Sequence, residues 1–278
     1  MVFLIIFYLR SEFMARPARW KRIKFSDGVQ EYALSSWKYF SDFVNQELLD
    51  YTTYVYRGHA VSSWKLEPTL DRIINSPTST KRDEHLARFK LETRGRRGPN
   101  PAILNDENDW WALGQHHGLA TPLLDWTESP FVALFFAMSK AIELNSRNIT
   151  VYALAQSAIS TRNKIIESND TIPLINRKKP TVKIVRPFSD ENSRLVSQRG
   201  LFTRGPNNLD LESWIRKHKV AGREKIIEIM KISIPVSEQD IKDSLRYLNR
   251  MNINHATLFP DLSGASDYCN LHLKTPKY

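Results

Sequence analysis

The 278-residue sequence contains a single cysteine, Cys269. One cysteine excludes an internal disulfide and any zinc site built from paired cysteines. Sparse cysteine is also typical of proteins that stay in a reducing compartment, so we expect a cytoplasmic location. We expect no metal site, because the adjacent His116 and His117 point in different directions in any regular structure and cannot readily share one ion.

A long hydrophobic run is missing as well. The apolar stretch near the start covers only residues 2–9, whereas a helix needs about 20 apolar residues to cross a bilayer. Ser11 and Glu12 follow it where a signal peptide would have a small-residue cleavage site. We therefore expect no stable membrane insertion. Either the run belongs to an upstream extension of a chain that starts naturally at Met14, or it is a weak membrane tether.

The common catalytic motifs are also absent. The sequence contains no GxGxxG, no GxxxxGK[ST], no GxSxG, no HExxH and no kinase-type set. Dehydrogenases, phosphate-loop enzymes, hydrolases of the nucleophile-elbow type and zinc proteases are therefore not indicated.

The composition is that of a basic globular protein. Hydrophobic residues make up 41% of the chain, and 40 Lys and Arg against 30 Asp and Glu give a net charge of +10. Basic clusters lie at residues 94–97, 177–179 and 216–219. This balance favours a nucleotide, a nucleic acid or another anionic partner, although it is also common among housekeeping proteins.

The hydrophobic patterns predict one α+β domain in which strands and helices alternate irregularly. We assign residues 1–34 to an N-terminal extension and 35–278 to the domain. The expected helices are 37–49, 81–92, 106–114, 130–144, 238–249 and a short one after 258–262; the expected strands are 51–56, 123–127, 149–155, 182–185, 195–202 and 226–236. Residues 164–179 and 206–223 are expected to be polar connections.

Polar residues gather just before the most apolar predicted helix, which spans 130–144. Ser129 and Pro130 are typical of a helix start. His117, Asp125, Thr127 and Glu128 precede them, and polar groups at the edge of a core are typical of a binding pocket. The alternatives are structural: a histidine bonded into its loop, helix capping by the Asp125–Thr127 pair, and a Glu128 that stabilises the helix dipole.

Two arginine-glycine pairs also stand out. Arg57 and Gly58 end a predicted strand, where a planar guanidinium next to a glycine suits phosphate or carboxylate binding; a structural salt bridge is the alternative. Gln198 precedes Arg199 and Gly200 on a predicted late strand, which could also be a plain edge strand with a bulge.

Several segments together resemble the FRG domain family. They are YRG at 56–58, QHHG at 115–118, LLDWTESP at 123–130 and ALFFA at 133–137; RLVSQRGLF at 194–202 and INHATLFPDL at 253–262 resemble the family's later motifs. The resemblance covers roughly residues 35–269. The family occurs in bacteria and phages, sometimes near defence or toxin genes, so the resemblance implies an effector of that kind.

More distantly, the chain is similar to ADP-ribosyltransferases, which implies a split mixed sheet flanked by helices and NAD as co-substrate. Carried over by position, Arg57 with Gly58 holds the NAD phosphate or ribose, Thr127 braces the nicotinamide ribose, and Gln198 replaces the catalytic glutamate. An amide keeps the hydrogen bond and loses the charge. No Glu-x-Glu pair occurs near the late strands, where Glu224 and Glu228 are four apart.

The missing glutamate leaves the function open. In the leading hypothesis Glu128, Asp125 or His117 supplies the polarity, and the chain cleaves the nicotinamide bond of NAD with transfer to a macromolecule or to water. The second hypothesis is a non-catalytic nucleotide-binding or interaction module. The third, based on the basic clusters, is a toxin that acts on nucleic acid. The acceptor and the oligomeric state stay open.

Overall fold

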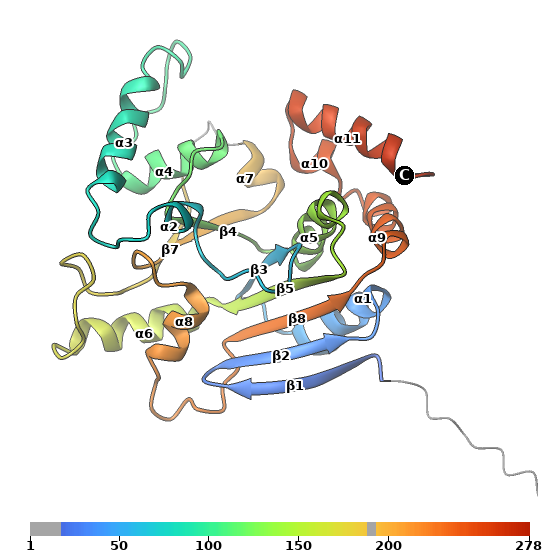
Figure 1. The fold of residues 1–278 in the computed structure, drawn as a ribbon, viewed down its shortest axis with the longest axis horizontal. Helices are drawn as coiled ribbons and strands as arrows, with labels where there is room; N and C mark the ends of the chain where they lie inside the picture. Colours follow the sequence, from blue (N-terminus) through green and yellow to red (C-terminus); the bar gives the residue numbers. More distant parts are fainter. Residues whose placement is uncertain (1–17, 188–192) are drawn as a thin grey trace, which may run out of the picture.

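The computed structural model describes residues 18–187 and 193–278 (Figure 1). The expectations for residues 2–9 and for a natural start at Met14 lie outside these ranges. Among the helices of the described ranges, none combines the length and the apolar composition needed to cross a bilayer.

One eight-stranded mixed sheet organises the chain, which confirms the expected α+β class with a mixed sheet. Its strand order is β1-β2-β8-β5-β3-β4-β7-β6. Neighbouring strands are antiparallel except for the parallel pair β2 and β8. The strands are β1 (Trp20–Ser26), β2 (Val29–Leu34), β3 (Tyr54–His59), β4 (Leu123–Thr127), β5 (Asn148–Ala155), β6 (Lys183–Val185), β7 (Gly200–Arg204) and β8 (Ile229–Pro235).

The hairpin of β1 and β2 lies in the range that we expected to be an extension. Asp27 and Gly28 join its strands with φ values of 51° and 83°, the positive values that a two-residue hairpin turn requires. Tyr32 and Leu34 of β2 are buried in the core. Residues 20–34 are therefore part of the sheet, contrary to an extension over 1–34, because β2 supplies core side chains and pairs with β8.

Helices cover both faces of the sheet (Figure 1). One apolar cluster joins the sheet to the helical segments of residues 37–48 and to α5 (Pro130–Leu144) and α9 (Glu238–Arg250). A second cluster on the other face includes α6 (Gln156–Ser168) and α8 (Leu211–Lys217). The remaining helices are α2 (Thr69–Ile73), α3 (Lys81–Glu92), α4 (Glu107–His116), α7 (Ser193–Ser197), α10 (His255–Leu258) and α11 (Leu262–Lys274).

Helix α5 begins and lies as the sequence predicts. The side chain of Ser129 accepts a hydrogen bond from Val132 N, and Pro130 occupies the first turn. The helix is buried over most of its surface, and its backbone approaches β3 at Gly58, where a side chain would overlap the carbonyl oxygen of Ala133. Gly58 therefore permits the close approach of a helix.

Three expected connections or strands differ from the structure. The polar range 206–223 contains α8, and 164–179 begins inside α6. Residues 195–202 are not one strand, because α7 ends at Ser197 and β7 begins only at Gly200. The apolar residues of that range have different surroundings: Val196 is 81% exposed, while Leu201 and Phe202 are buried in the sheet.

Candidate functional site

The sheet opens between β3 and β4. These strands pair at a single position, Tyr56 with Thr127. Beyond it Arg57 spans the gap: its Nη1 donates to the backbone oxygen of Asp125 at 2.8 Å and lies 3.3 Å from a carboxylate oxygen of the same residue. The Arg57 side chain thus binds the carbonyl oxygen of Asp125, a residue of β4 that does not pair with β3.

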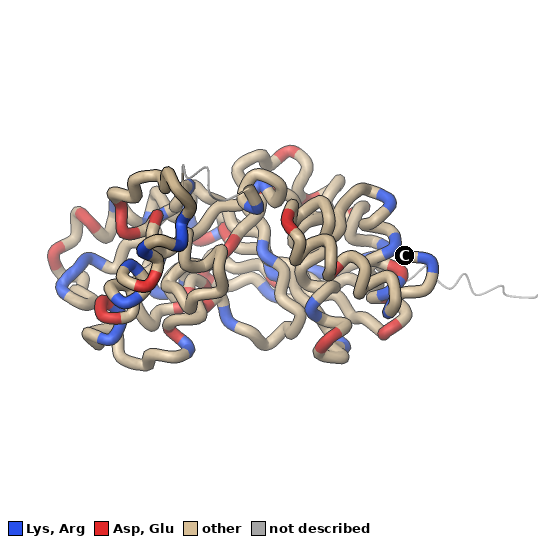
Figure 2. Tube along the Cα trace, turned by 90° about the horizontal axis from the view of Figure 1, so that it is seen from above, with Lys and Arg blue, Asp and Glu red and all other residues tan. Residues whose placement is uncertain are grey.

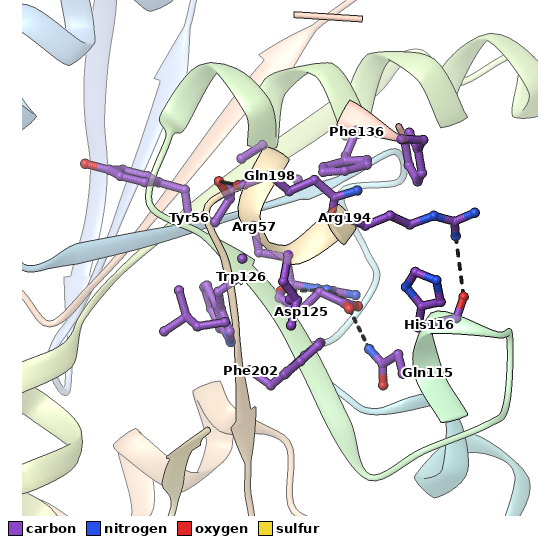
Figure 3. A pocket seen from close by; sticks show the side chains of 17 residues that line it. Tyr56, Arg57, Gln115, His116, Asp125, Trp126, Phe136, Arg194, Gln198 and Phe202 are labelled. Carbon is purple, nitrogen blue, oxygen red and sulfur yellow. Dashed lines mark hydrogen bonds and ion pairs between the residues drawn. The ribbon is translucent and has the colours of Figure 1, made fainter. Parts of the chain in front are cut away.

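A cavity of about 330 Å³ lies at this opening (Figure 3). Its walls come from β3, β4, β7, the end of α4, the start of α5, α7 and the segment after α10. The lining residues are Tyr56, Arg57, Gly58, Gln115, His116, Asp125, Trp126, Thr127, Ala133, Phe136, Arg194, Leu195, Gln198, Gly200, Leu201, Phe202 and Phe259. Such a volume is at the lower end of the range for small-molecule sites, about 300–1,000 Å³.

Asp125 is the one carboxylate among these lining residues. One of its oxygens accepts from Gln115 Nε2 at 2.6 Å, and the other faces Arg57. Gln115 in turn contacts the hydroxyl of Thr121, so the amide is held from both sides. The carboxylate has a fixed orientation, yet its side chain is 59% exposed and can reach a ligand.

His59 holds the other end of Arg57. Its Nε2 accepts from Arg57 Nε at 3.1 Å, and the ring packs at the edges of Trp64 and Tyr152. Burial, and secondly the nearby guanidinium, lower the pKa of His59 to about 3. The ring therefore stays neutral at physiological pH and can accept this hydrogen bond.

The buried neutral His59 makes stability depend on pH. The unfolded chain binds a proton at this ring below about pH 6.5, and the folded chain does so only near pH 3. Because the unfolded state then holds more protons, stability falls as the pH drops, by about 2 kcal/mol between pH 6.5 and 5. His59→Gln keeps an acceptor without this titration. Urea denaturation should show the stability difference between the two proteins narrowing from pH 7 to 5; a constant difference contradicts the assignment.

The side chain of Thr127 contacts the backbone of Gln198. The Thr127 hydroxyl donates to the carbonyl oxygen of Gln198 at 2.7 Å and accepts from Ser129 N at 3.1 Å. The Gln198 amide donates to the carbonyl oxygen of Leu258 at 3.0 Å. Both residues line the cavity with Arg57 and Asp125. Gln198 lies in the turn between α7 and β7 rather than on a strand, and its amide N–H is already bonded.

Two predicted site residues lie outside the cavity lining. His117 is the exposed C-terminal cap of α4, and the side chains of the preceding Gln115 and His116 line the cavity instead. Consecutive side chains of a helix point in different directions, so a shift of one residue changes the face. Glu128 is exposed and pairs with Arg199 at 3.0 Å and Arg186 at 3.3 Å. The expected placement of His117 and Glu128 in the cleft is thus corrected.

Arg194 also lines the cavity, although the sequence analysis did not single it out as a site residue. Arg194 of α7 pairs with Asp261 at 2.6 Å and lies over the ring of Phe259. It also donates to the carbonyl oxygen of His116 (Figure 3). Arg194 and Phe259 belong to the segments 194–202 and 253–262, whose similarity to the later FRG motifs was the available signal. The cavity thus combines two guanidinium groups, one carboxylate and several aromatic rings.

Residues 52–146 match the family model of the FRG domain. No curated protein and no protein of known structure matches the chain. The matched segment supplies Arg57, Asp125, Gln115 and helix α5, while α7 and the segment after α10 follow it. The match over residues 52–146 confirms the resemblance of this segment to the FRG domain family.

Proposed function

We propose that the cavity binds the nicotinamide-ribose end of NAD. The chain cleaves the bond between nicotinamide and ribose and transfers the ADP-ribosyl group to a macromolecule or to water. The observation that carries the proposal is the pairing of Asp125, the one acid among the lining residues, with Arg57 across the opening of the sheet. This places a negative group and an anion-binding group within one small cavity. The distant similarity of the sequence to ADP-ribosyltransferases adds the expectation of NAD.

The ligand class follows from the cavity walls. Trp126, Phe136, Phe202 and Phe259 offer planar apolar surfaces to an aromatic ring. Arg57 and Arg194 both line the cavity, and a guanidinium group suits a phosphate. A volume of about 330 Å³ accommodates part of a dinucleotide, so the remainder would lie at the open mouth.

In this proposal Asp125, rather than Gln198, takes the role of the catalytic glutamate of ADP-ribosyltransferases. When the ribose C1′–nitrogen bond breaks, its electron pair leaves with nicotinamide and positive charge develops on the ribose. A carboxylate stabilises that charge, which an amide cannot. The acceptor, water or a nucleophile of the target, then forms the new bond to C1′ and releases a proton. Arg57 and Gln115 hold the Asp125 oxygens in place during this step.

The decisive experiment follows nicotinamide release from NAD by the purified chain and by Asp125→Asn. We expect the variant to lose at least about 100-fold in rate, the size typical of removing one electrostatic stabiliser. Its stability should change by no more than about 1 kcal/mol, because the pair with Arg57 is exposed. Glu128→Gln is the matched control, since this nearby acid lies outside the cavity lining, and it should retain the rate.

A second candidate is a nucleotide-binding module without turnover. The bond from the Gln198 amide to Leu258 favours it, because that amide is already committed within the protein. NAD binding without nicotinamide release would support the module. Unchanged release by Asp125→Asn, or no NAD binding at all, would rule out the proposal.

The nucleic-acid hypothesis has less support from the surface. In the view of Figure 2, Lys and Arg lie interspersed with Asp and Glu along the trace. Binding to a nucleic-acid backbone requires several phosphate contacts along one basic surface. The charges of this chain favour a local anion site.

A further inference from the structure

We infer that a second cavity, between α4, β6, β7 and the turn at residues 175–178, binds a phosphate or pyrophosphate group of a small molecule. It has a volume of about 180 Å³ and shares no lining residue with the first cavity. The basic lining residues are Lys178, Lys179, Lys183, Arg82 and Arg204, and the acids are Asp83 and Glu107. The inference does not depend on NAD cleavage.

The two arginines of this cavity are neutralised by the protein itself. Arg204 donates to Glu107 at 2.7 Å and to Asn108 at 2.8 Å. Arg82 is buried with Asp71, at 2.7 Å. These contacts fix the positions of both guanidinium groups and leave the lysines to set the net charge of the cavity.

Lys179 pairs with Asp170 at 3.4 Å, but the other two lysines are not neutralised in this way. Within residues 18–187 and 193–278, the ammonium groups of Lys178 and Lys183 have no ion-pair partner at 4.0 Å or less. Lys183 is moreover the direct cross-strand partner of Arg204 on the ladder between β6 and β7. Like charges in directly opposed positions destabilise a sheet. Because Glu107 already neutralises Arg204, Lys183 is the group whose charge an anion bound here would neutralise.

The backbone holds Lys178 close to the other cations. Ile175 and Lys178 exchange backbone hydrogen bonds of 2.9 and 3.1 Å, which close a tight turn. The two residues between them, Asn176 and Arg177, have φ values of 50° and 60°, as a two-residue turn of this hand requires. The ordered turn fixes the Lys178 backbone at the cavity wall.

The size of the cavity limits the ligand. About 180 Å³ is below the range for whole small-molecule ligands, about 300–1,000 Å³, so the site suits a phosphate or pyrophosphate group. In the view of Figure 2, Lys and Arg lie interspersed with Asp and Glu along the trace. The phosphate group can therefore belong to a free anion or to the end of a larger metabolite.

The test is calorimetric titration of the full chain with inorganic pyrophosphate at low salt. Lys183→Gln should weaken binding at least about tenfold, as expected for one charge-assisted contact. The free variant should melt close to the parent chain, because Lys183 is exposed and has no ion-pair partner within the described ranges. Lys21→Gln is the matched control, since Lys21 lies on β1 at the opposite edge of the sheet, and it should bind as the parent chain does.

Titrations with adenosine diphosphate and with a single-stranded oligonucleotide distinguish the possible sources of phosphate. Binding of the diphosphate in competition with pyrophosphate, and its loss in Lys183→Gln, would support a small phosphorylated metabolite. The inference is overturned if pyrophosphate does not bind or if Lys183→Gln binds it as well as the parent chain. It is also overturned if the oligonucleotide alone binds at Lys183, since the surface would then recognise a nucleic acid.

Discussion

Gly58→Ala should leave little folded protein. An added Cβ would overlap the carbonyl oxygen of Ala133 and lie 2.9 Å from Ala137 N. These are backbone atoms of α5, so relief requires the helix to move away from β3. The helix packs in the middle of the main core, where Phe135 and Met138 are completely buried. We expect a loss of more than about 4 kcal/mol, in the range reserved for severe core disruption.

The measurement is thermal unfolding followed by circular dichroism, with Gly205→Ala as the control. A Cβ at Gly205 would have its nearest neighbours at 3.9 Å, so that variant should melt close to the parent chain. Equal melting of the two variants would show that α5 can move back without cost. The result also bears on the predicted role of Gly58 in ligand binding, because any loss of binding in this variant would follow from the loss of the fold.

The sequence predicted the centre of the site because local rules and packing agree there. Ser129 and Pro130 start a helix in almost any context, and the apolar helix that follows must be buried. Burying it fixes β4 in front of it and therefore the positions of Asp125 and Thr127. The YRG segment could be placed because it belongs to a strand, β3, that is rich in β-forming residues.

The errors arose where tertiary contacts decide the structure. Whether Gln115, His116 or His117 lines the cavity depends on where α4 ends, and helix ends shift by one or two residues with little sequence signal. Helix α8 has a buried face only because Trp214 packs against residues of the sheet distant in the sequence. Arg194 comes to the cavity through Phe259 and Asp261, contacts across more than 60 residues that no local pattern encodes.

The two glutamates near the late strands also show that sequence spacing does not determine the surroundings of a side chain. Glu224 and Glu228 are four apart in the sequence, but Glu224 is exposed and Glu228 is buried at the junction of β2, α6 and β8. Glu228 pairs with the buried guanidinium of Arg162, which also donates to the carbonyl oxygen of Ile215. Neither acid lines the cavity between β3 and β4, so Glu228 has a structural role here.

Glu228→Ala should therefore destabilise the fold by about 3–5 kcal/mol, because it leaves the charge of Arg162 buried without its partner. The double variant Glu228→Ala with Arg162→Met should regain much of this loss, since the unpaired charge is gone and an apolar side chain fills its place. Urea denaturation at pH 7 gives both values, and Glu224→Gln, exposed at the same segment, should keep the parent midpoint. If the double variant is as unstable as Glu228→Ala alone, the cost comes from the lost packing of the carboxylate rather than from the isolated charge of Arg162.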